Sequence, residues 1–300
     1  MPSSSLYLKS ALFSAALALG VLSASTYADD AAISAALKAK GAEMTEAQGE
    51  ITGISFKTKT SFTEAEAQQI HQLAHLKTIS FGLGFDDAAF SLLNGLPELE
   101  SFSSNGMDAS DDTVRILGMC KKLKSIAFFH PGKRFTGAGL AALADLPGLE
   151  RLTVAGSGEI SDQGMAAIAT LKHLKEFRVW HSGVTVEGIK KLQSLPEIKS
   201  LTIGQRLAYK PPTTVSDETV VAVAGCPSLE ALALQEARLT LPALSQLKKL
   251  PHLKKLTLDG IDLSDADLAS LKQQLPQTEI KWTAPNDAAK KRIDALFGAR

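Results

Sequence analysis

Apolar residues recur along most of the chain in a short block with the spacing L-x-x-L-x-L, and the block returns about every 24 residues. After a degenerate first copy at Ile51, Ile54 and Phe56, the blocks are Leu76-Ile79-Phe81, Leu99-Phe102, Leu123-Ile126-Phe128, Leu149-Leu152-Val154, Leu174-Phe177-Val179, Ile198-Leu201-Ile203, Leu229-Leu232-Leu234 and Leu253-Leu256-Leu258. Alternating apolar positions predict a strand with one buried face. The pattern therefore predicts about nine strands.

A second pattern follows each block: a Ser or Thr, usually beside an acid or a glycine, and then apolar residues at helical spacing. It occurs at Thr63-Glu64, Ser110-Asp111, Thr136-Gly137, Ser161-Asp162, Thr185-Val186, Ser216-Asp217, Thr240-Leu241 and Ser264-Asp265. A hydroxyl there accepts hydrogen bonds from free amides of a helix's first turn, and an adjacent acid suits the positive end of the helix dipole. Each repeat is therefore expected to be a strand, a tight connection and a short helix.

One such unit cannot bury its own apolar face, so the repeats must stack, with strands on the concave side and helices on the convex side. The motif resembles that of secreted bacterial leucine-rich-repeat proteins of the ribonuclease-inhibitor-like type, whose repeats read L-x-x-L-x-L, a turn, and T-D-x-G-L-x-x-L. The best matches are residues 149–171, with the run Ser161-Asp162-Gln163-Gly164-Met165, and residues 253–271. The resemblance spans about residues 51–282. It implies an α/β leucine-rich-repeat solenoid with a curved parallel sheet, and protein or ligand binding.

The chain departs from this family at the turn after the strand, where many leucine-rich repeats carry Asn to pair buried backbone groups. Here the corresponding positions hold Gly84, Met107, Ser157, Ser182, Ala237 and Ile261. We expect the main chain or water to pair those groups instead, because an unpaired buried donor costs roughly 1 to 3 kcal/mol.

The first 28 residues have the composition of an export signal. Lys9 precedes an apolar run over residues 11–22, and the small residues Thr26 and Ala28 fit a cleavage site before Asp29. The run is shorter than the roughly 20 apolar residues that span a bilayer. We therefore expect a signal peptide over residues 1–28 and a secreted or periplasmic mature protein that is not inserted in a membrane.

The ends of a solenoid need covering, because terminal repeats would otherwise expose apolar surface. Residues 31–39 are expected to be helical, and a hairpin is expected to turn at Gly49. Thr278–Trp282 is a candidate last strand, before an amphipathic helix. The solvent side of that helix is expected to carry Lys290, Lys291 and Arg292. The expected domains are an N-terminal cap (29–50), the solenoid (51–283) and a C-terminal capping helix (284–300).

The charge balance limits the classes of partner, and the cysteine positions indicate whether a disulfide can form. Lys plus Arg number 32, as do Asp plus Glu, so no net field attracts nucleic acid or an anionic membrane. Cys120 and Cys226 fill a slot that holds Leu in other repeats, and four repeats place them roughly 20 Å apart. A disulfide needs Cα atoms within about 7 Å, so we expect two buried core thiols. A monomer without a cofactor is expected.

The sequence shows no catalytic motif. It contains no G-x-S-x-G elbow, phosphate-binding glycine loop or H-E-x-x-H zinc motif. His71 and His75 lie one helical turn apart, but no Cys or third His is near them in the sequence, which favours a surface pair over a metal site. A folded constellation, such as Glu176 beside His181, remains a possible basis for catalysis.

Residues between the core positions of each strand face the concave side. One column reads Ser80, Ser103, Ala127, Thr153, Arg178, Thr202, Ala233, Thr257, and the next reads Gly82, Asn105, Phe129, Ala155, Trp180, Gly204, Gln235, Asp259. Phe129 and Trp180 are expected about 10 Å apart with Ala155 between them. Together with Arg178 they have the residue types of binding hot spots, so we expect a slot for a flat or extended ligand. The alternative is that the rings pack on each other.

Two repeats carry insertions where strand turns to helix, at residues 130–134 and 206–212, and both insertions leave the same edge of the sheet. Long connections are often functional, although tolerated drift explains them equally well. The expected basic and aromatic rim consists of His130, Lys133, Arg134, Arg206, Tyr209 and Lys210, with Arg178 and His181 between the loops.

These patterns predict an exported, non-catalytic scaffold that binds a protein or an anionic glycan. Binding is expected on the concave face and the loop edge, at the aromatic, Arg, His and Lys residues named above. The alternative is an extracytoplasmic hydrolase or a metal-binding protein.

Overall fold

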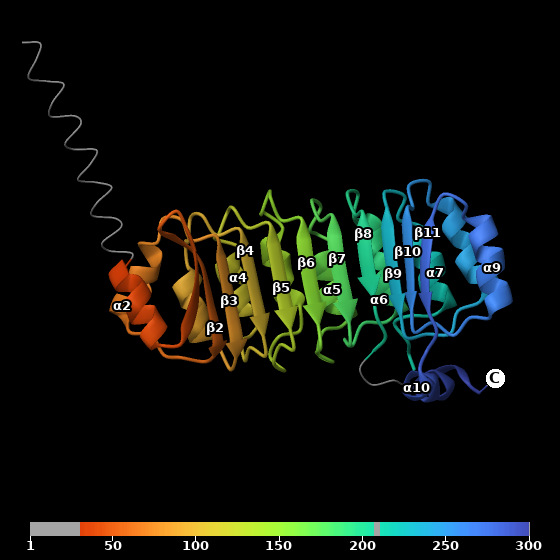
Figure 1. Ribbon diagram of the computed structural model, residues 1–300, viewed down its shortest axis with the longest axis horizontal. Helices are drawn as coiled ribbons and strands as arrows, with labels where there is room; N and C mark the ends of the chain where they lie inside the picture. The colour runs from red at the N-terminus through yellow and green to blue at the C-terminus, as the bar shows by residue number, and fades with distance from the viewer. Residues whose placement is uncertain (1–30, 207–210, 300) are drawn as a thin grey trace, which may run out of the picture.

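The computed structural model describes residues 31–206 and 211–299, and it confirms the solenoid: eleven strands lie side by side in chain order in one sheet (Figure 1). They are β1 (Ala42–Ala47), β2 (Glu50–Thr58), β3 (Thr78–Leu83), β4 (Ser101–Asn105), β5 (Ser125–Phe129), β6 (Arg151–Ala155), β7 (Glu176–Trp180), β8 (Ser200–Ile203), β9 (Ala231–Gln235), β10 (Lys255–Asp259) and β11 (Glu279–Thr283). β2 to β10 match the predicted repeat strands, and only β1 runs antiparallel to its neighbour. The expected export signal lies outside the described residues.

The strand register agrees with the prediction. Thr153 of β6 lies opposite Arg178 of β7, which in turn lies opposite Thr202 of β8. Phe177 and Val179, the neighbours of Arg178 in sequence, are fully buried on the other side of the sheet. Because successive side chains of a strand point to opposite faces, one face enters the core and the other forms the concave surface.

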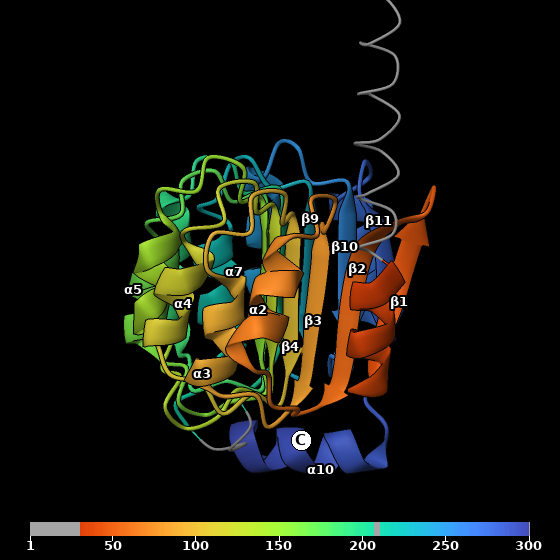
Figure 2. The same cartoon turned by 90° about the vertical axis from the view of Figure 1, so that its left-hand side faces the viewer.

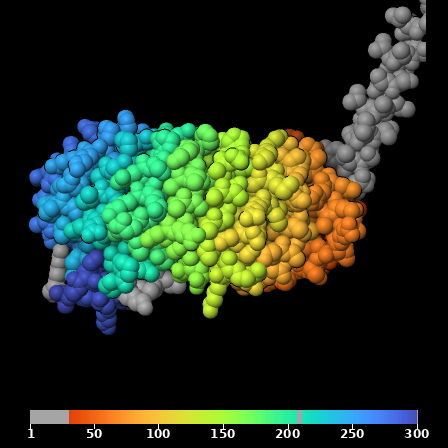
Figure 3. Space-filling view, turned by 180° about the vertical axis from the view of Figure 1, so that it is seen from behind, coloured from red at the N-terminus to blue at the C-terminus, as the bar shows by residue number. Residues whose placement is uncertain are grey.

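Short helices cover the other face of the sheet (Figure 2). They are α2 (Glu64–His71), α3 (Asp87–Phe90), η1 (Ser91–Leu93), α4 (Asp112–Leu117), η2 (Ala138–Leu143), α5 (Asp162–Ile168), α6 (Val186–Lys190), η3 (Lys191–Ser194), α7 (Asp217–Val223), α8 (Leu241–Leu244), η4 (Ser245–Lys249), α9 (Asp265–Gln274) and α10 (Asp287–Phe297). Seen from behind, the repeats follow one another in chain order along the molecule (Figure 3). Within the described ranges, no helix is long and apolar enough to cross a bilayer.

The predicted helix starts are mostly correct. Thr63, Ser161, Thr185, Ser216, Thr240 and Ser264 are the N-caps of their helices. Thr63 and Glu66 form the reciprocal capping box that their spacing favours. At the two other predicted starts the helix begins one residue later than expected, after Asp111 and Gly137.

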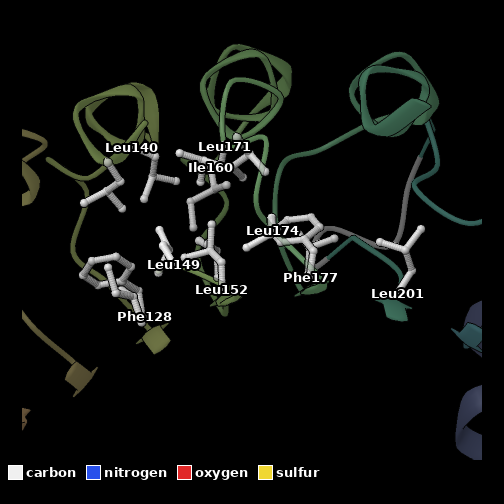
Figure 4. Packing of buried hydrophobic residues seen from close by; sticks show 14 of the residues in the cluster. Phe128, Leu140, Leu149, Leu152, Ile160, Leu171, Leu174, Phe177 and Leu201 are labelled. Atoms are coloured by element: carbon white, nitrogen blue, oxygen red, sulfur yellow. The ribbon is translucent and has the colours of Figure 1, made fainter. Parts of the chain in front are cut away.

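A continuous apolar core fills the space between sheet and helices. Phe128, Leu152, Phe177 and Leu201 come from successive strands, and helix-side residues such as Leu171 face them (Figure 4). Each repeat thus closes its neighbour's apolar face, as a stacked solenoid requires.

The two cysteines are core thiols, as expected. Both Cys120 and Cys226 are buried and free. Burial raises the pKa of each thiol to about 11, because the thiolate is poorly solvated there. Neither thiol therefore has the thiolate character that a reactive cysteine needs.

Aspartates join successive helices in a way that the sequence analysis did not predict. Asp162, the first residue of α5, accepts hydrogen bonds from the backbone amide of Thr185 at 2.8 Å and from its hydroxyl at 2.7 Å. The same pairing joins Asp87 to Ser110, Asp111 to Thr136, and Asp217 to Thr240. An aspartate at the start of one helix therefore binds the Ser or Thr at the start of the next helix, as well as suiting its own helix dipole.

Main-chain hydrogen bonds take the place of an asparagine ladder, as expected. The amide of Gly132, for example, donates to the carbonyl of Met107 at 2.8 Å. In the longest repeat a buried amide side chain contributes as well: Gln205 Oε1 accepts from the backbone amide of Thr214 at 2.9 Å, and Nε2 donates to the carbonyl of Val215 at 3.0 Å. Gln205 therefore ties the end of the insertion back to the sheet edge.

The N-terminal end has the expected helix and hairpin. Residues 31–39 are helical, and β1 pairs with β2 around Gln48 and Gly49, whose φ angles are 55° and 86°. Two left-handed residues suit a tight hairpin turn. At the other end, β11 extends the sheet one residue later than Thr278–Trp282, the expected range.

The helix expected to cap the C-terminal end does not stack on the last repeat. α10 lies beneath the carboxyl ends of the strands (Figures 1 and 2). It is held there by Arg238, whose guanidinium contacts Asp262 at 2.7 Å and Asp294 of α10 at 2.6 Å. Only 9% of the Arg238 side chain is exposed, so these contacts are largely shielded from water.

The solvent face of α10 also differs in part from the expectation. Lys290 and Lys291 are exposed as expected. Arg292 is half-buried, and its guanidinium contacts the carboxylate of Glu236 at 3.1 Å. This contact brings α10 next to the concave residues described below.

Candidate functional site

Phe129 and Trp180 lie on the concave face over Ala155, in the register that their positions predict. Their ring centroids are 6.1 Å apart and the ring planes are tilted by 52°. A flat ligand between two rings needs about 7 Å, twice the carbon contact distance. The expected slot therefore does not form: the rings pack on each other, and Ala155 beneath them is 2% exposed.

A pocket opens instead on the other side of Trp180. It has a volume of about 330 Å³ and extends across β8 toward β9 and β10. One wall consists of Trp180, His181 and Arg178, whose guanidinium carbon lies 5.2 Å from the Trp180 ring centroid. Thr202 of β8 lines the pocket between the two walls.

The opposite wall carries acidic and amide side chains that the sequence analysis did not single out. It is formed by Gln235, Glu236 and Asp259. Gln235 and Asp259 stood in the second predicted column, but nothing in the sequence indicated that they face Trp180 across β8. The pocket therefore joins an aromatic and cationic wall to an acidic one.

Gly204 permits the two walls to approach. A Cβ atom at this position would lie 2.5 Å from Trp180 Cβ and 2.8 Å from Gln235 Oε1. Both distances are far below ordinary van der Waals contact, so any larger residue would displace one wall. Gly204 therefore sets the distance between the walls.

The backbone of the residue directly after the strand has an unusual conformation in three repeats. This residue is left-handed in most repeats, where it is Gly84, Gly106, Gly156 or Gly260. Three repeats carry a side chain in that conformation: His130, His181 and Glu236, with φ angles of 47°, 49° and 56°. Left-handed backbone costs a non-glycine residue roughly 1 to 2 kcal/mol. His181 and Glu236 both line the pocket, so the strain is concentrated at the candidate site.

Ion contacts connect the pocket to α10. His181 Nε2 lies 3.8 Å from Glu236 Oε2, and Arg292 of α10 contacts the other oxygen of the same carboxylate. Glu176, the acid considered beside His181, lies at the start of β7, five residues and about 16 Å along the chain from His181. The acid that meets His181 is therefore Glu236.

In the described part of the expected basic rim, both loop arginines are engaged by groups of the protein itself. Arg134 contacts Asp87 at 2.7 Å and also donates to the carbonyl of Asp108, so its charge is directed toward the N-terminal repeats. Arg206 donates to the carbonyl of Pro212 within its own loop at 2.7 Å. Lys133 is exposed. Tyr209 and Lys210 lie outside the described residues.

Two other histidines make local surface contacts. His130 Nδ1 contacts Asn105 Oδ1 at 3.0 Å, at the end of the neighbouring strand. His75 Nε2 lies 3.1 Å from Glu50. In the described part of the chain, no group of three His, Cys, Asp or Glu side chains is placed to hold a metal ion.

No family model matches the sequence, and no curated protein is similar to it. Among solved structures 190 chains match. One is the internalin inlF of Listeria monocytogenes, with a TM-score of 0.48, 16% identity and coverage of 73% of this chain. This chain spans about 64% of the length of that internalin structure.

Proposed function

We propose that this chain is an exported, non-catalytic scaffold that recognises a protein partner through its concave face. The observation that carries the proposal is the cluster of Phe129, Arg178 and Trp180 beside the 330 Å³ pocket. Trp and Arg dominate binding hot spots, and rigid strands hold these side chains in place. The strained residues at the pocket edge support a binding site at the same place, since backbone strain is retained where it serves a function.

An anionic glycan, the other partner considered, is less well supported. Two carboxylates, Glu236 and Asp259, line the pocket opposite Arg178. An anionic ligand would have to approach both of them, and like charges at close range cost several kcal/mol. Arg134, which the basic rim required, is already engaged with Asp87.

A hydrolase remains the second candidate because His181 and Glu236 meet at the pocket. Arg292 contacts the same carboxylate at 3.1 Å, which gives Glu236 a structural partner. The proposed binding role needs no proton transfer from this pair. We further propose a monomer in the periplasm or outside the cell, in line with the expected signal peptide.

The test is capture of proteins from native envelope and culture fractions by the mature chain starting at Asp29. A Phe129→Ala, Arg178→Ala, Trp180→Ala variant should lose the partner. A matched variant, Met119→Ala with Val221→Ala, removes two exposed apolar side chains and should keep it. Capture by all three proteins would move the site away from the concave face. Circular dichroism melting would verify that each variant is folded.

A further inference from the structure

The chemistry of the concave pocket indicates its ligand more closely than the fold does. Four of its polar side chains, Arg178, Thr202, Gln235 and Asp259, make no hydrogen bond or ion pair with any residue in the described part of the chain. Three of them present different functions: a guanidinium that only donates, a carboxylate that only accepts, and an amide that does both. A ligand that pairs with all three must itself carry both donors and acceptors.

The charges around the pocket are balanced. Arg178 stands on one wall and Asp259 on the other, while Glu236 is matched by Arg292 at 3.1 Å. A cationic ligand is attracted by the two carboxylates and repelled by the two arginines, and the reverse holds for an anionic ligand, so neither gains a net attraction. A neutral ligand loses nothing by carrying no charge.

The aromatic wall adds a preference for a ring with aliphatic C–H groups. Trp180 lines the pocket, and the face of an indole carries partial negative charge. The C–H groups of a sugar ring are slightly positive and lie on one face, while its hydroxyl groups project from the rim. The Arg178 guanidinium already lies over part of the indole, 5.2 Å from the ring centroid. A sugar ring would therefore pack on the part of Trp180 that stays exposed to the pocket and hydrogen-bond to the side chains around it.

We propose that this pocket binds a neutral sugar residue. Its hydroxyl groups donate to Asp259 and accept from Arg178 and Gln235, and Thr202 contributes its hydroxyl from β8. The volume of about 330 Å³ is at the lower end of small-ligand pockets, which suits one or two sugar rings. The inference shares the concave site of the proposed function but requires no protein partner.

Isothermal titration of the mature chain tests this directly with maltotriose, cellotriose, N-acetylchitotriose and mannotriose as neutral probes. Trigalacturonate and trilysine serve as the anionic and cationic probes. At least one neutral probe should bind, and both charged probes should bind at least tenfold more weakly. If no neutral probe binds, or if a charged probe binds most tightly, the proposal is overturned.

Variants assign the binding to the pocket. Trp180→Ala and Gly204→Leu should each weaken the neutral probe at least tenfold, the first by removing the aromatic wall and the second by filling the pocket. Asp259→Asn and Arg178→Gln each remove a charge-assisted hydrogen bond to a sugar hydroxyl, so each should weaken the neutral probe about tenfold. Unchanged affinity in both variants would show that these side chains do not hold the probe and would overturn the proposal. Arg151→Gln, on β6 outside the pocket lining, is the matched control and should bind normally.

Failure of this inference is distinguishable from failure of the proposed function. Protein capture that depends on Phe129, Arg178 and Trp180, without binding of any neutral probe, overturns the sugar site alone. Probe binding without capture of any protein supports the sugar site and contradicts the protein partner.

Discussion

The carboxylate of Asp162 holds the cap of the next helix in the stack: it accepts from both the amide and the hydroxyl of Thr185. The two residues are 23 positions apart in sequence. Such a pairing occurs in four repeats, so the aspartate at the start of a helix contributes to the contact between repeats as well as to its own helix.

Replacing Asp162 by Ala should lower the free energy of unfolding by about 1 to 3 kcal/mol, because two donors of Thr185 lose their acceptor. Asp265 is the matched control: it is also the first residue of its helix, and it is exposed in the last repeat. Asp265→Ala should cost less than about 0.5 kcal/mol. Urea unfolding followed by circular dichroism measures both, and equal losses would contradict a role between repeats.

The hydrogen bonds between repeats also predict that the stability contributed by Asp87 depends on pH. Burial alone would raise the pKa of this carboxyl, but hydrogen bonds from Ser110, Thr113 and Arg134 outweigh it and lower the pKa from 3.8 to about 2. The folded state therefore binds the proton more weakly than the unfolded chain, so the stability that Asp87 contributes is present above pH 3.8 and is lost as the pH falls toward about 2.

Urea unfolding between about pH 5 and pH 2 should show a steeper loss of stability in the natural protein than in Asp87→Asn. The side chain is 39% exposed, so solvent screening should keep the difference below about 1 kcal/mol. Parallel curves for the two proteins would show that the hydrogen bonds at Asp87 do not favour its charged form.

Gln205 is expected to be the most sensitive polar residue near the insertion. Gln205→Leu removes the partners of the Thr214 amide and the Val215 carbonyl in a buried place, at a cost of about 3 kcal/mol. Gln235→Leu, an equal change at a half-buried pocket position, should cost less than about 0.5 kcal/mol. Thermal melting of the two variants measures the difference in stability between them. A similar melting point for both would exclude the anchoring role of Gln205.

His181→Gly should stabilise the fold by about 1 kcal/mol, since glycine adopts the left-handed conformation without steric cost. The reverse change, Gly260→Ala, has no neighbour closer than 3.8 Å to the added carbon and should destabilise by a similar amount. His181→Gly should also weaken the partner captured by the concave face. A variant that loses stability would show that contacts of His181 exceed its backbone strain.

The sequence was sufficient to predict the concave neighbours. Strand periodicity and a constant repeat placed Phe129, Ala155 and Trp180 in one row, and the register confirms that order. The sequence was not sufficient to predict that the rings of Phe129 and Trp180 touch, because side-chain packing decides whether each ring tilts toward the other by a few ångströms. The opposite wall escaped notice for the same reason: Gln235 meets Trp180 only because Gly204 leaves the space between them empty.

The position of α10 is the second feature that the sequence did not predict. Its amphipathic pattern predicted a helix over about the correct residues, but no local pattern states which surface the helix meets. That was decided by Arg238 and Glu236, which contact residues 56 positions later in the chain. The sequence by itself determined the strands, the helices and their stacking, because these depend on residue spacings that recur in every repeat. Only the tertiary structure decided the pocket and the placement of α10, since both depend on single contacts that occur once.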